Sequence, residues 1–532
     1  MTRRFDFSLV ALACLAALFF APLSYGQAVA VAEIHGQVLD PSGSAIAGAT
    51  VKLTQTDTQY TRTTTSDAAG GYIFANLPLG PYRLEVTNQG FKTNVQSGIV
   101  LQVGNNVQIN ASLQVGTVSE NIEVQAQASM VETKDNAVSQ VIDQRRILEL
   151  PLNGRQATSL VLLAGGAVNA PTAGNDNVGS KSFYSSVVIA VAGSQGNNVN
   201  YLLDGGDNND TFSNVNLPFP FPDALQEFSV ETNALPARNG LHPGGAVNVV
   251  TKSGTNQLHG DLFEFLRNGS ENARNYFLAT HDVLHRNQFG GTAGGRIVKD
   301  KLFFFGGYQG MRQVQGVPQS QIVLPTPAAL TGDFSTLDKT KQLVDPANGT
   351  PFPGNKIPVT RFDPAAVAFA KYLPVVNDPS GTFTYSIART GNEDQMLGRV
   401  DFLQSAKNTM FVRYFLDDYS NPAVWDPHNI LVTTVTGNVE RAQSTTLGDT
   451  YTLSPTTVNS FHATFSRRRN DRASAPSMIG PGDLGITPAT CAPLFRPTSR
   501  SSSPAARRLR AAPPAPRPTS TSTRSSTPTT ST

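Results

Sequence analysis

The sequence predicts a mainly β protein, in which a small sandwich is followed by a mixed α/β domain and by antiparallel strands of the barrel type. Of the 532 residues, 15% are charged, whereas 45 are Gly and 8% are aromatic, which is typical of strands and turns rather than of helical bundles. Short segments alternate in polarity with a period of two, and turn residues separate them. The net charge of +2 gives no global field that would attract nucleic acid.

Residues 1–28 are predicted to be a signal peptide. Arg3 and Arg4 precede an apolar run from Leu9 to Phe20, and small residues follow up to Ala28. A membrane anchor is the alternative, but the run is shorter than the ~20 residues that a spanning helix needs. After cleavage the chain would keep Cys491 alone, so no intrachain disulfide is expected.

Residues 32–116 are predicted to form the sandwich, because strands of alternating polarity follow each other at intervals of about ten residues. Their inward positions include Ile34, Val51, Tyr72 and Leu84. The stretch IHGQVLDPSGSAIAGATVKL and the later GGYIFANLPLGPYRLEV resemble the carboxypeptidase regulatory-like, or transthyretin-like, domain. That resemblance implies a non-catalytic module, and His35 has no neighbouring partner that would complete a zinc site.

Residues 117–128 contain an extended segment that resembles a TonB box. The candidate residues are Ile122, Glu123, Val124, Gln125 and Ala126. Such a segment would pair with the sheet edge of a partner through backbone hydrogen bonds, which require little from the side chains. By itself the pattern also fits an ordinary strand, and its position just before the next block favours the coupling role.

Residues 129–256, called the central domain below, carry several motifs in order. A helix is expected from Gln140 to Leu150, because Pro151 disfavours helical geometry in the residue before it. Strands are expected at Val187–Ala192 and Asn248–Thr251. The stretches LELPLNGRQATSLVLLAGGA, IAVAGSQGNNVNYLLDGGDNND and GGAVNVVTKSG resemble the plug domain of TonB-dependent receptors, especially the Oar-like group. The motif residues are Leu152, Asn153, Gly154, Arg155, Asp204, Gly205, Gly244, Gly245 and Asn248.

Two groups of residues raise the question of a metal site. Asp204, Asp207 and Asp210 lack the spacing and the terminal bidentate Glu of a calcium loop, so a solvated loop is the preferred interpretation. His281 and His285 are four residues apart, but the Glu of a zincin motif is missing. No metal and no cofactor are therefore expected.

Residues 257–490 are predicted to contain the first strands and loops of a membrane barrel. The clearest pair is Gln395–Gln404 and Thr409–Asp418, in which apolar and polar side chains alternate over about ten residues. A soluble sandwich would show a similar period. Further strands are expected at Gln443–Leu453 and Val458–Arg467, and the segment from Gln288 to Tyr308 resembles an early hairpin of the same family. The polar stretch from Gln313 to Glu393 is expected to form extracellular loops, the longer ones in such barrels.

The composition changes after Thr490. Residues 491–532 are rich in Ser, Thr, Pro and Arg and show no strand pattern. A natural disordered tail is one interpretation. An interrupted reading frame is the preferred one, because about seven or eight strands precede it whereas plugged transporters have about 22.

The resemblance implies a TonB-dependent receptor in the outer membrane that takes up a solute and makes or breaks no bond. The implied partners are TonB with ExbB and ExbD, outer-membrane lipid, the barrel assembly machinery and the solute; nucleic acid is not among them. The alternative is an exported binding or adhesive protein that uses the sandwich and the central domain as soluble modules. Cell fractionation would separate these two hypotheses.

Overall fold

The computed structural model describes residues 32–117, 121–125, 138–152, 154–170, 188–211, 214–233, 244–274, 283–316, 320–336, 341–385, 387–434, 437–454, 457–473, 475, 478–486 and 523–525. The predicted signal peptide lies outside these residues, as do Ala126, Asn153, His281 and Cys491.

The sandwich consists of two sheets around one apolar core. Its first sheet contains β1 (Ala32–Leu39), β4 (Gly71–Leu77), β7 (Asn106–Gln108) and β8 (Ala111–Ser112). Its second sheet has the order β3 (Thr61–Thr65), β2 (Thr50–Gln55), β5 (Gly80–Thr87), β6 (Thr93–Leu101) and β9 (Asn121–Gln125). Ile34, Val51, Tyr72 and Leu84 are buried in the core between them, which confirms the predicted strands and their inward faces.

The central domain is built on a five-stranded sheet of order β10, β15, β16, β13 and β14. The strands are β10 (Val138–Asp143), β13 (Asn200–Leu203), β14 (Gly206–Asp207), β15 (Leu225–Asn233) and β16 (Ala246–Thr251). Short elements cover it, namely α2 (Gln144–Glu149), η1 (Ala157–Leu163), β11 (Ala167–Asn169), β12 (Ile189–Val191) and η3 (Pro222–Ala224). They enclose an apolar core that includes Ile147, Leu160 and Phe228.

The predicted helix from Gln140 to Leu150 is wrong in its first part. Residues 138–143 form β10, which pairs antiparallel with β15 from Val138↔Asn233 to Asp143↔Glu227. The helix α2 starts only after Asp143, whose side chain accepts a hydrogen bond of 2.9 Å from the Arg146 backbone N–H as its N-cap. Strand pairing thus takes priority over helix propensity in this segment.

The barrel sheet is one long antiparallel meander followed by a short strand. Its order is β17 (His259–Asn268), β18 (Leu284–Val298), β19 (Leu302–Gly316), β22 (Ala388–Ser405), β23 (Asn408–Asn421), β24 (Gly437–Ser454), β25 (Thr457–Ala473) and β26 (Thr523–Ser525). The predicted hairpins are confirmed, although most strands are longer than expected. In the described residues the sheet is open, because β17 and β26 are its two ends.

The outer face of the sheet is apolar and its inner face is polar. The predicted alternation alone did not distinguish a membrane barrel from a soluble sandwich, and the direction of the two faces does. Val400, Met410 and Val412 are exposed on the outer face. Arg413 and Asp417 lie on the inner face and are almost completely buried. This arrangement is the reverse of a soluble sandwich and is typical of a transmembrane barrel. Among the described residues, no helix has the length and apolar content to cross a membrane.

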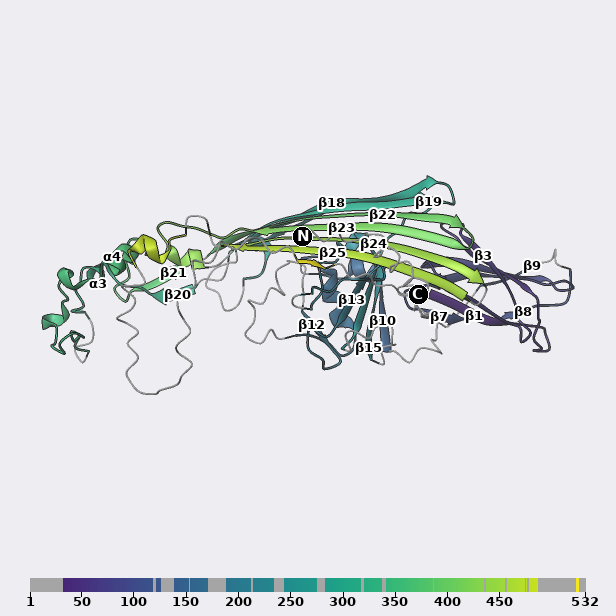
Figure 1. Cartoon of the computed structure of the whole chain (residues 1–532), viewed down its shortest axis with the longest axis horizontal. Coiled ribbons are helices and arrows are strands. Elements are labelled where there is room, and N and C mark those ends of the chain that lie inside the picture. Colours follow the sequence, from purple (N-terminus) through teal and green to yellow (C-terminus); the bar gives the residue numbers. More distant parts are fainter. Residues whose placement is uncertain are drawn as a thin grey trace, which may run out of the picture.

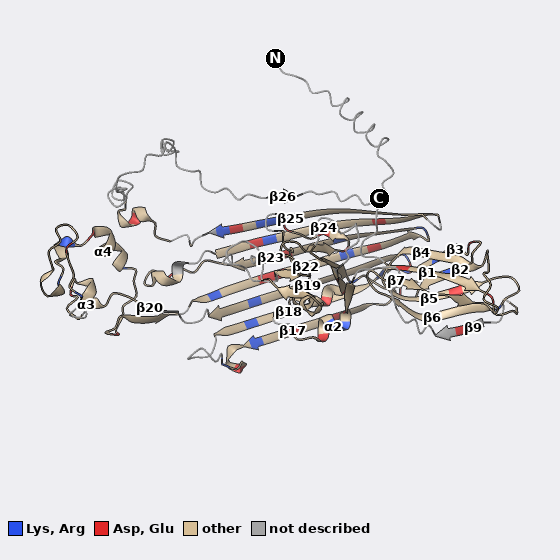
Figure 2. Ribbon diagram, turned by 90° about the horizontal axis from the view of Figure 1, so that it is seen from below, with Lys and Arg blue, Asp and Glu red and all other residues tan. Residues whose placement is uncertain are grey.

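Figure 1 shows the sandwich at one end of the long strands and the central domain against the middle of the sheet. The turns at the sandwich end are short, such as residues 299–301 and 406–407. At the opposite end the chain leaves the sheet between β19 and β22 and forms β20 (Ser320–Val323), β21 (Thr382–Tyr385), α3 (Pro327–Leu330) and α4 (Pro364–Ala370). Figure 2 shows the same separation from another side. Long loops at one end and short turns at the other are the pattern of outer-membrane barrels.

Candidate functional site

The candidate site is the surface on which the central domain lies against the inner face of the barrel sheet. Its centre is the hairpin β13–β14, whose two-residue turn is Asp204-Gly205. Both residues have positive φ, at 50° and 77°, which is the requirement of a type I′ turn and explains the Asp-Gly pair. The turn directs the Asp204 side chain toward the barrel strands.

The Asp204 carboxylate lies between two arginines of the barrel. Its Oδ1 is 3.0 Å from Arg399 Nη1 and its Oδ2 is 3.2 Å from Arg413 Nε. The backbone N–H of Thr251 donates to Oδ1 at 2.9 Å. Because the side chains of Asp204 and Arg413 are 2% and 1% exposed, the pair is shielded from water and needs these hydrogen bonds to offset its desolvation.

Each arginine also has partners on other groups. Arg399 Nη2 is 2.8 Å from Asp401 Oδ1. Arg413 donates to Thr446 Oγ1 at 2.7 Å and to the backbone oxygen of Leu203 at 3.3 Å. Among the described residues, loss of Asp204 would therefore leave Arg399 paired with Asp401, whereas Arg413 would have no carboxylate partner.

Three further ion pairs lie at the edges of the same surface. Asp210 of the central domain is 2.7 Å from Arg468 of β25, which is 3.3 Å from Glu440 of β24. Arg155 pairs with Asp223 inside the central domain. Its guanidinium also lies 4.5 Å and 4.0 Å from the ring centroids of two β17 phenylalanines, Phe263 and Phe265, which is a cation–π arrangement.

A small apolar contact lies between these charged groups. Phe221 and Ala224 of the central domain form one buried cluster with Phe305, Leu397 and Phe415 of the barrel. Most of the specific contacts across the surface are nevertheless hydrogen bonds and ion pairs, which water is able to replace if the two parts separate.

The sandwich contacts both other parts at the end of the barrel sheet. The backbone N–H of Val103 donates to the Glu227 carboxylate of the central domain. The Tyr60 hydroxyl donates to the backbone oxygen of Ala406, in the turn between β22 and β23, at 3.3 Å. The Asn256 backbone N–H donates to the Asp57 backbone oxygen at 3.0 Å.

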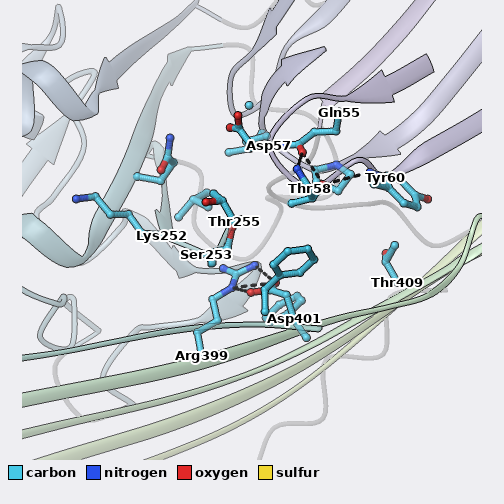
Figure 3. A pocket seen from close by; sticks show the side chains of 18 of the residues that line it. Gln55, Asp57, Thr58, Tyr60, Lys252, Ser253, Thr255, Arg399, Asp401 and Thr409 are labelled. Atoms are coloured by element: carbon cyan, nitrogen blue, oxygen red, sulfur yellow. Dashed lines mark hydrogen bonds and ion pairs between the residues drawn. The ribbon is translucent and has the colours of Figure 1, made fainter. Parts of the chain in front are cut away.

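A cavity of about 480 Å³ lies where the three parts meet. Figure 3 shows Arg399 and Asp401 on its barrel side, with Lys252 and Ser253 from the end of the central domain. The sandwich contributes the opposite side, with Gln55, Asp57, Thr58 and Tyr60 among the lining residues. In the described part of the chain, no group of three or more His, Cys, Asp or Glu side chains is arranged to hold a metal ion.

The structure corrects the interpretation of the Asp cluster. Asp204 and Asp210 are buried and ion-paired, so a solvated loop is the wrong interpretation for both. The alternation predicted for Gln395–Gln404 and Thr409–Asp418 puts Arg399 and Arg413 on the polar face of their strands. It does not indicate their partner, and nothing in the sequence indicates Arg468. The alternation of polarity marks the face of a strand, but a contact between residues about 200 positions apart leaves no local signal.

The remaining motif residues of the central domain lie in turns and strand pairs. Gly154 and Arg155 have positive φ in the turn that follows Leu152, and the Gly154 backbone oxygen accepts from Gln288 at 3.0 Å. Gly245 has a φ of 146°. A Cβ at Gly244 would overlap the Ser194 side chain, and one at Gly245 would lie 2.9 Å from Val191. Asn248 is buried and donates to Glu231 at 3.2 Å.

Other residues singled out in the sequence lie away from this surface. Residues 121–125 of the TonB-box-like segment are extended, as predicted, and pair with β6 of the sandwich. His35 is buried in β1 without a hydrogen-bond partner for either ring nitrogen among the described residues. His285 is exposed on β18 rather than on a helix. The three residues of β26, within the segment predicted to be disordered, pair with Ser466–Arg468 of β25.

The contact between sandwich and central domain is expected to respond to pH. Burial raises the pKa of Glu227 from about 4.5 to about 7, and the negative charge of Asp143 adds to the rise. Because the Glu227 carboxyl binds its proton more tightly in the folded than in the unfolded chain, protonation of Glu227 stabilises the fold. This stabilisation is complete below about pH 4.5 and is lost as the pH rises through about 7. At about 1.36 kcal/mol per pKa unit, Glu227→Gln should remove about 3 kcal/mol of this pH dependence while keeping an oxygen for Val103.

Urea unfolding of the full chain in detergent micelles at several pH values would measure this change. Above pH 7 the E227Q protein should be more stable than the wild type. As a control, Glu149→Gln alters an exposed ion pair with Arg145 and should leave the free energy of unfolding almost unchanged. Identical pH slopes for the wild-type and E227Q proteins would contradict the expected result.

Comparison with known proteins gives the following similarities. Residues 250–527 match a family model described as an outer membrane beta barrel domain, and residues 33–114 match one described as a carboxypeptidase regulatory-like domain. The TonB-dependent transporter Oar of Myxococcus xanthus is 28% identical over 304 residues, which are 54% of this chain and 28% of Oar. The chain thus spans little more than a quarter of this curated relative.

Two solved structures match part of this chain at low sequence identity. A mutant of the ferric enterobactin receptor of Pseudomonas aeruginosa is 13% identical, with a TM-score of 0.38, and the match covers 64% of this chain and 42% of the receptor. The outer membrane transporter YddB of Escherichia coli is 10% identical, with a TM-score of 0.38, and the match covers 63% of this chain and 39% of YddB.

Proposed function

This chain belongs to the outer membrane beta barrel family, whose model matches more than half of it, and from this premise we propose that it acts as a TonB-dependent receptor for uptake of a solute. Its location is the outer membrane, in keeping with the barrel family and the similarity to Oar. In this proposal the barrel conducts, the central domain is the plug that gates it, and residues 122–126 transmit the pull of TonB. TonB itself works with ExbB and ExbD, and the barrel assembly machinery inserts the chain into lipid.

The observation that carries the proposal is the buried Asp204 between Arg399 and Arg413. A plug must be held firmly at rest and must still be able to move. An interface made of ion pairs fits both needs, because removal of one partner is costly while water replaces the hydrogen bonds when both sides separate. The same property sets this surface apart from the apolar cores of the sandwich and of the central domain.

The proposal assigns no chemical step to the chain. Uptake of a solute makes or breaks no bond, and we propose on that basis, together with the similarity to the transporter Oar, that the protein is not an enzyme. The exposed apolar face of the barrel sheet disfavours the alternative of a soluble binding module, because such a face would attract other apolar surfaces in water.

The coupling role is testable with two substitutions at one position. Glu123→Pro removes a backbone N–H and fixes φ, so it should lower the affinity of a peptide of residues 117–128 for the C-terminal domain of TonB by at least about tenfold. Glu123→Gln leaves the backbone unchanged, and its peptide should bind as the wild-type peptide does. Calorimetric titration gives both affinities, and a peptide has no β6 strand that would compete with TonB. Equal binding by the E123P and E123Q peptides would rule out pairing of this segment with TonB.

A further inference from the structure

The coupling segment is already paired with another strand of this chain. β9 runs parallel to β6, with a register from Thr93↔Asn121 to Ser97↔Gln125. The Ser97 hydroxyl donates to Glu123 Oε1 at 3.2 Å. β9 is therefore the terminal strand of the larger sheet of the sandwich.

The acceptor strand is held in place independently of β9. Asn94 of β6 donates to the backbone oxygen of Ser112 at 3.1 Å, and Gln96 donates to that of Asn110 at 3.1 Å. Both side chains are buried, and β6 is also paired with β5 along its other edge. The site on β6 would thus persist after β9 has left it, and β9 would be able to return.

The β6–β9 ladder is short, with five residue pairs, and it is parallel. Parallel pairing is slightly less stable per residue than antiparallel pairing. An unpaired β6 edge would in turn expose backbone groups that favour pairing with another strand. These properties are those of an exchangeable strand rather than of a permanent part of the sheet.

A pull on β9 would not reach the central domain while β9 stays on β6. The sandwich is itself held by Tyr60 at the barrel turn and by Val103 at Glu227, so it would carry the force. Only after β9 leaves β6 would tension pass through residues 126–137 to Val138 at the start of β10.

We propose that Thr93–Ser97 of β6 form a strand-acceptor site that β9 occupies in the resting protein, and that a partner takes β9 from this site by strand exchange. The inference rests on the proposed TonB coupling and adds a competition within the chain. The partner is one that offers a free sheet edge, and here that partner is TonB. The sandwich then acts as a competitor that must be displaced before the central domain is pulled.

A disulfide across the register tests the exchange. Ser97→Cys with Gln125→Cys joins register partners, in a background in which Cys14 and Cys491 are replaced by Ser. Ser97→Cys with Val124→Cys is the matched control, because adjacent positions of a strand point to opposite faces. We expect the first pair to close under mild oxidation and the control pair to remain open. Failure of the first pair to close would contradict the pairing of β9 with β6.

Binding of the C-terminal domain of TonB is then measured with the full chain in detergent micelles. The oxidised form of the S97C/Q125C protein should bind at least about tenfold more weakly than its reduced form, and reduction should restore the affinity. Equal affinity of both forms would overturn the exchange, since TonB would then bind without displacing β9 from β6. Absence of binding by the reduced protein and by a peptide of residues 117–128 would instead refute the proposed TonB coupling.

A single substitution on the acceptor strand gives an independent readout. Ser97→Ala removes the hydrogen bond to Glu123 without altering β9, so the competitor is weakened and TonB affinity should rise about twofold to fivefold. The oxidised S97C/Q125C protein and the S97A protein should thus change the affinity in opposite directions. An unchanged or lower affinity of the S97A protein would contradict the competition.

Discussion

Replacement of Asp204 by Asn is expected to lower the free energy of unfolding of the chain by about 3–5 kcal/mol, which is the usual cost of removing one partner of a buried ion pair. The physical reason lies with Arg413, whose side chain is 1% exposed and whose carboxylate partner is Asp204. Arg399 keeps Asp401 and should contribute less to the loss. Urea unfolding in detergent micelles measures the change.

Two further variants separate a charge effect from a packing effect. Arg413→Met in the D204N background removes the uncompensated charge and should recover a large part of the lost stability. Asp418→Asn removes a carboxylate from an exposed pair with Arg441 and should cost less than about 1 kcal/mol. If the D204N and D418N proteins unfold at the same urea concentration, the buried pair is not what holds the central domain against the barrel.

Gly254→Ala is expected to cost about 3 kcal/mol, at the upper end of the range for overpacked sites. Gly254 lies in the segment between β16 and β17, where the chain passes from the central domain to the barrel. A Cβ there would overlap the backbone oxygens of Gly295 and Phe304. These atoms belong to the paired strands β18 and β19, so they are unable to move aside as a flexible side chain would.

Gly398→Ala is the matched control for this substitution. Gly398 is on the exposed outer face of β22, and a Cβ there would meet no atom within 4 Å among the described residues. The G398A protein should unfold within about 0.5 kcal/mol of the wild type, as is usual for surface substitutions. If the G254A and G398A proteins lose comparable stability, the segment between β16 and β17 tolerates a side chain at position 254.

The sequence predicts local features of this fold better than it predicts contacts between its parts. The outward positions of Val400 and Met410 follow from a period of two, and Asp204-Gly205 has the composition of a tight hairpin turn. The sequence predicts a helix where β10 lies, because the strand character of β10 comes from pairing with β15, which begins about 80 residues later.

The candidate site is less predictable, because its function depends on contacts between the three parts. Nothing near Asp204 in the sequence indicates Arg413, and nothing near Glu227 indicates Val103. The pairing of residues 121–125 with β6 was also not predicted, since backbone ladders place few demands on side chains. Charged residues on the inner face of a barrel are a signal that a partner is present, but they do not identify it.

The position of β10 determines how the central domain would respond to mechanical force. β10 is an outer strand of its sheet and pairs with β15 alone among the described strands. Its last residue, Asp143, is the register partner of Glu227, which contacts the sandwich, so Val138 lies at the far end of the strand. A pull on Val138 toward the sandwich would peel β10 away from β15, so that the backbone hydrogen bonds between them break one after another. Breaking them in sequence needs a smaller force than breaking all of them at once. β10 would therefore detach while β15, β16 and β13 stay paired.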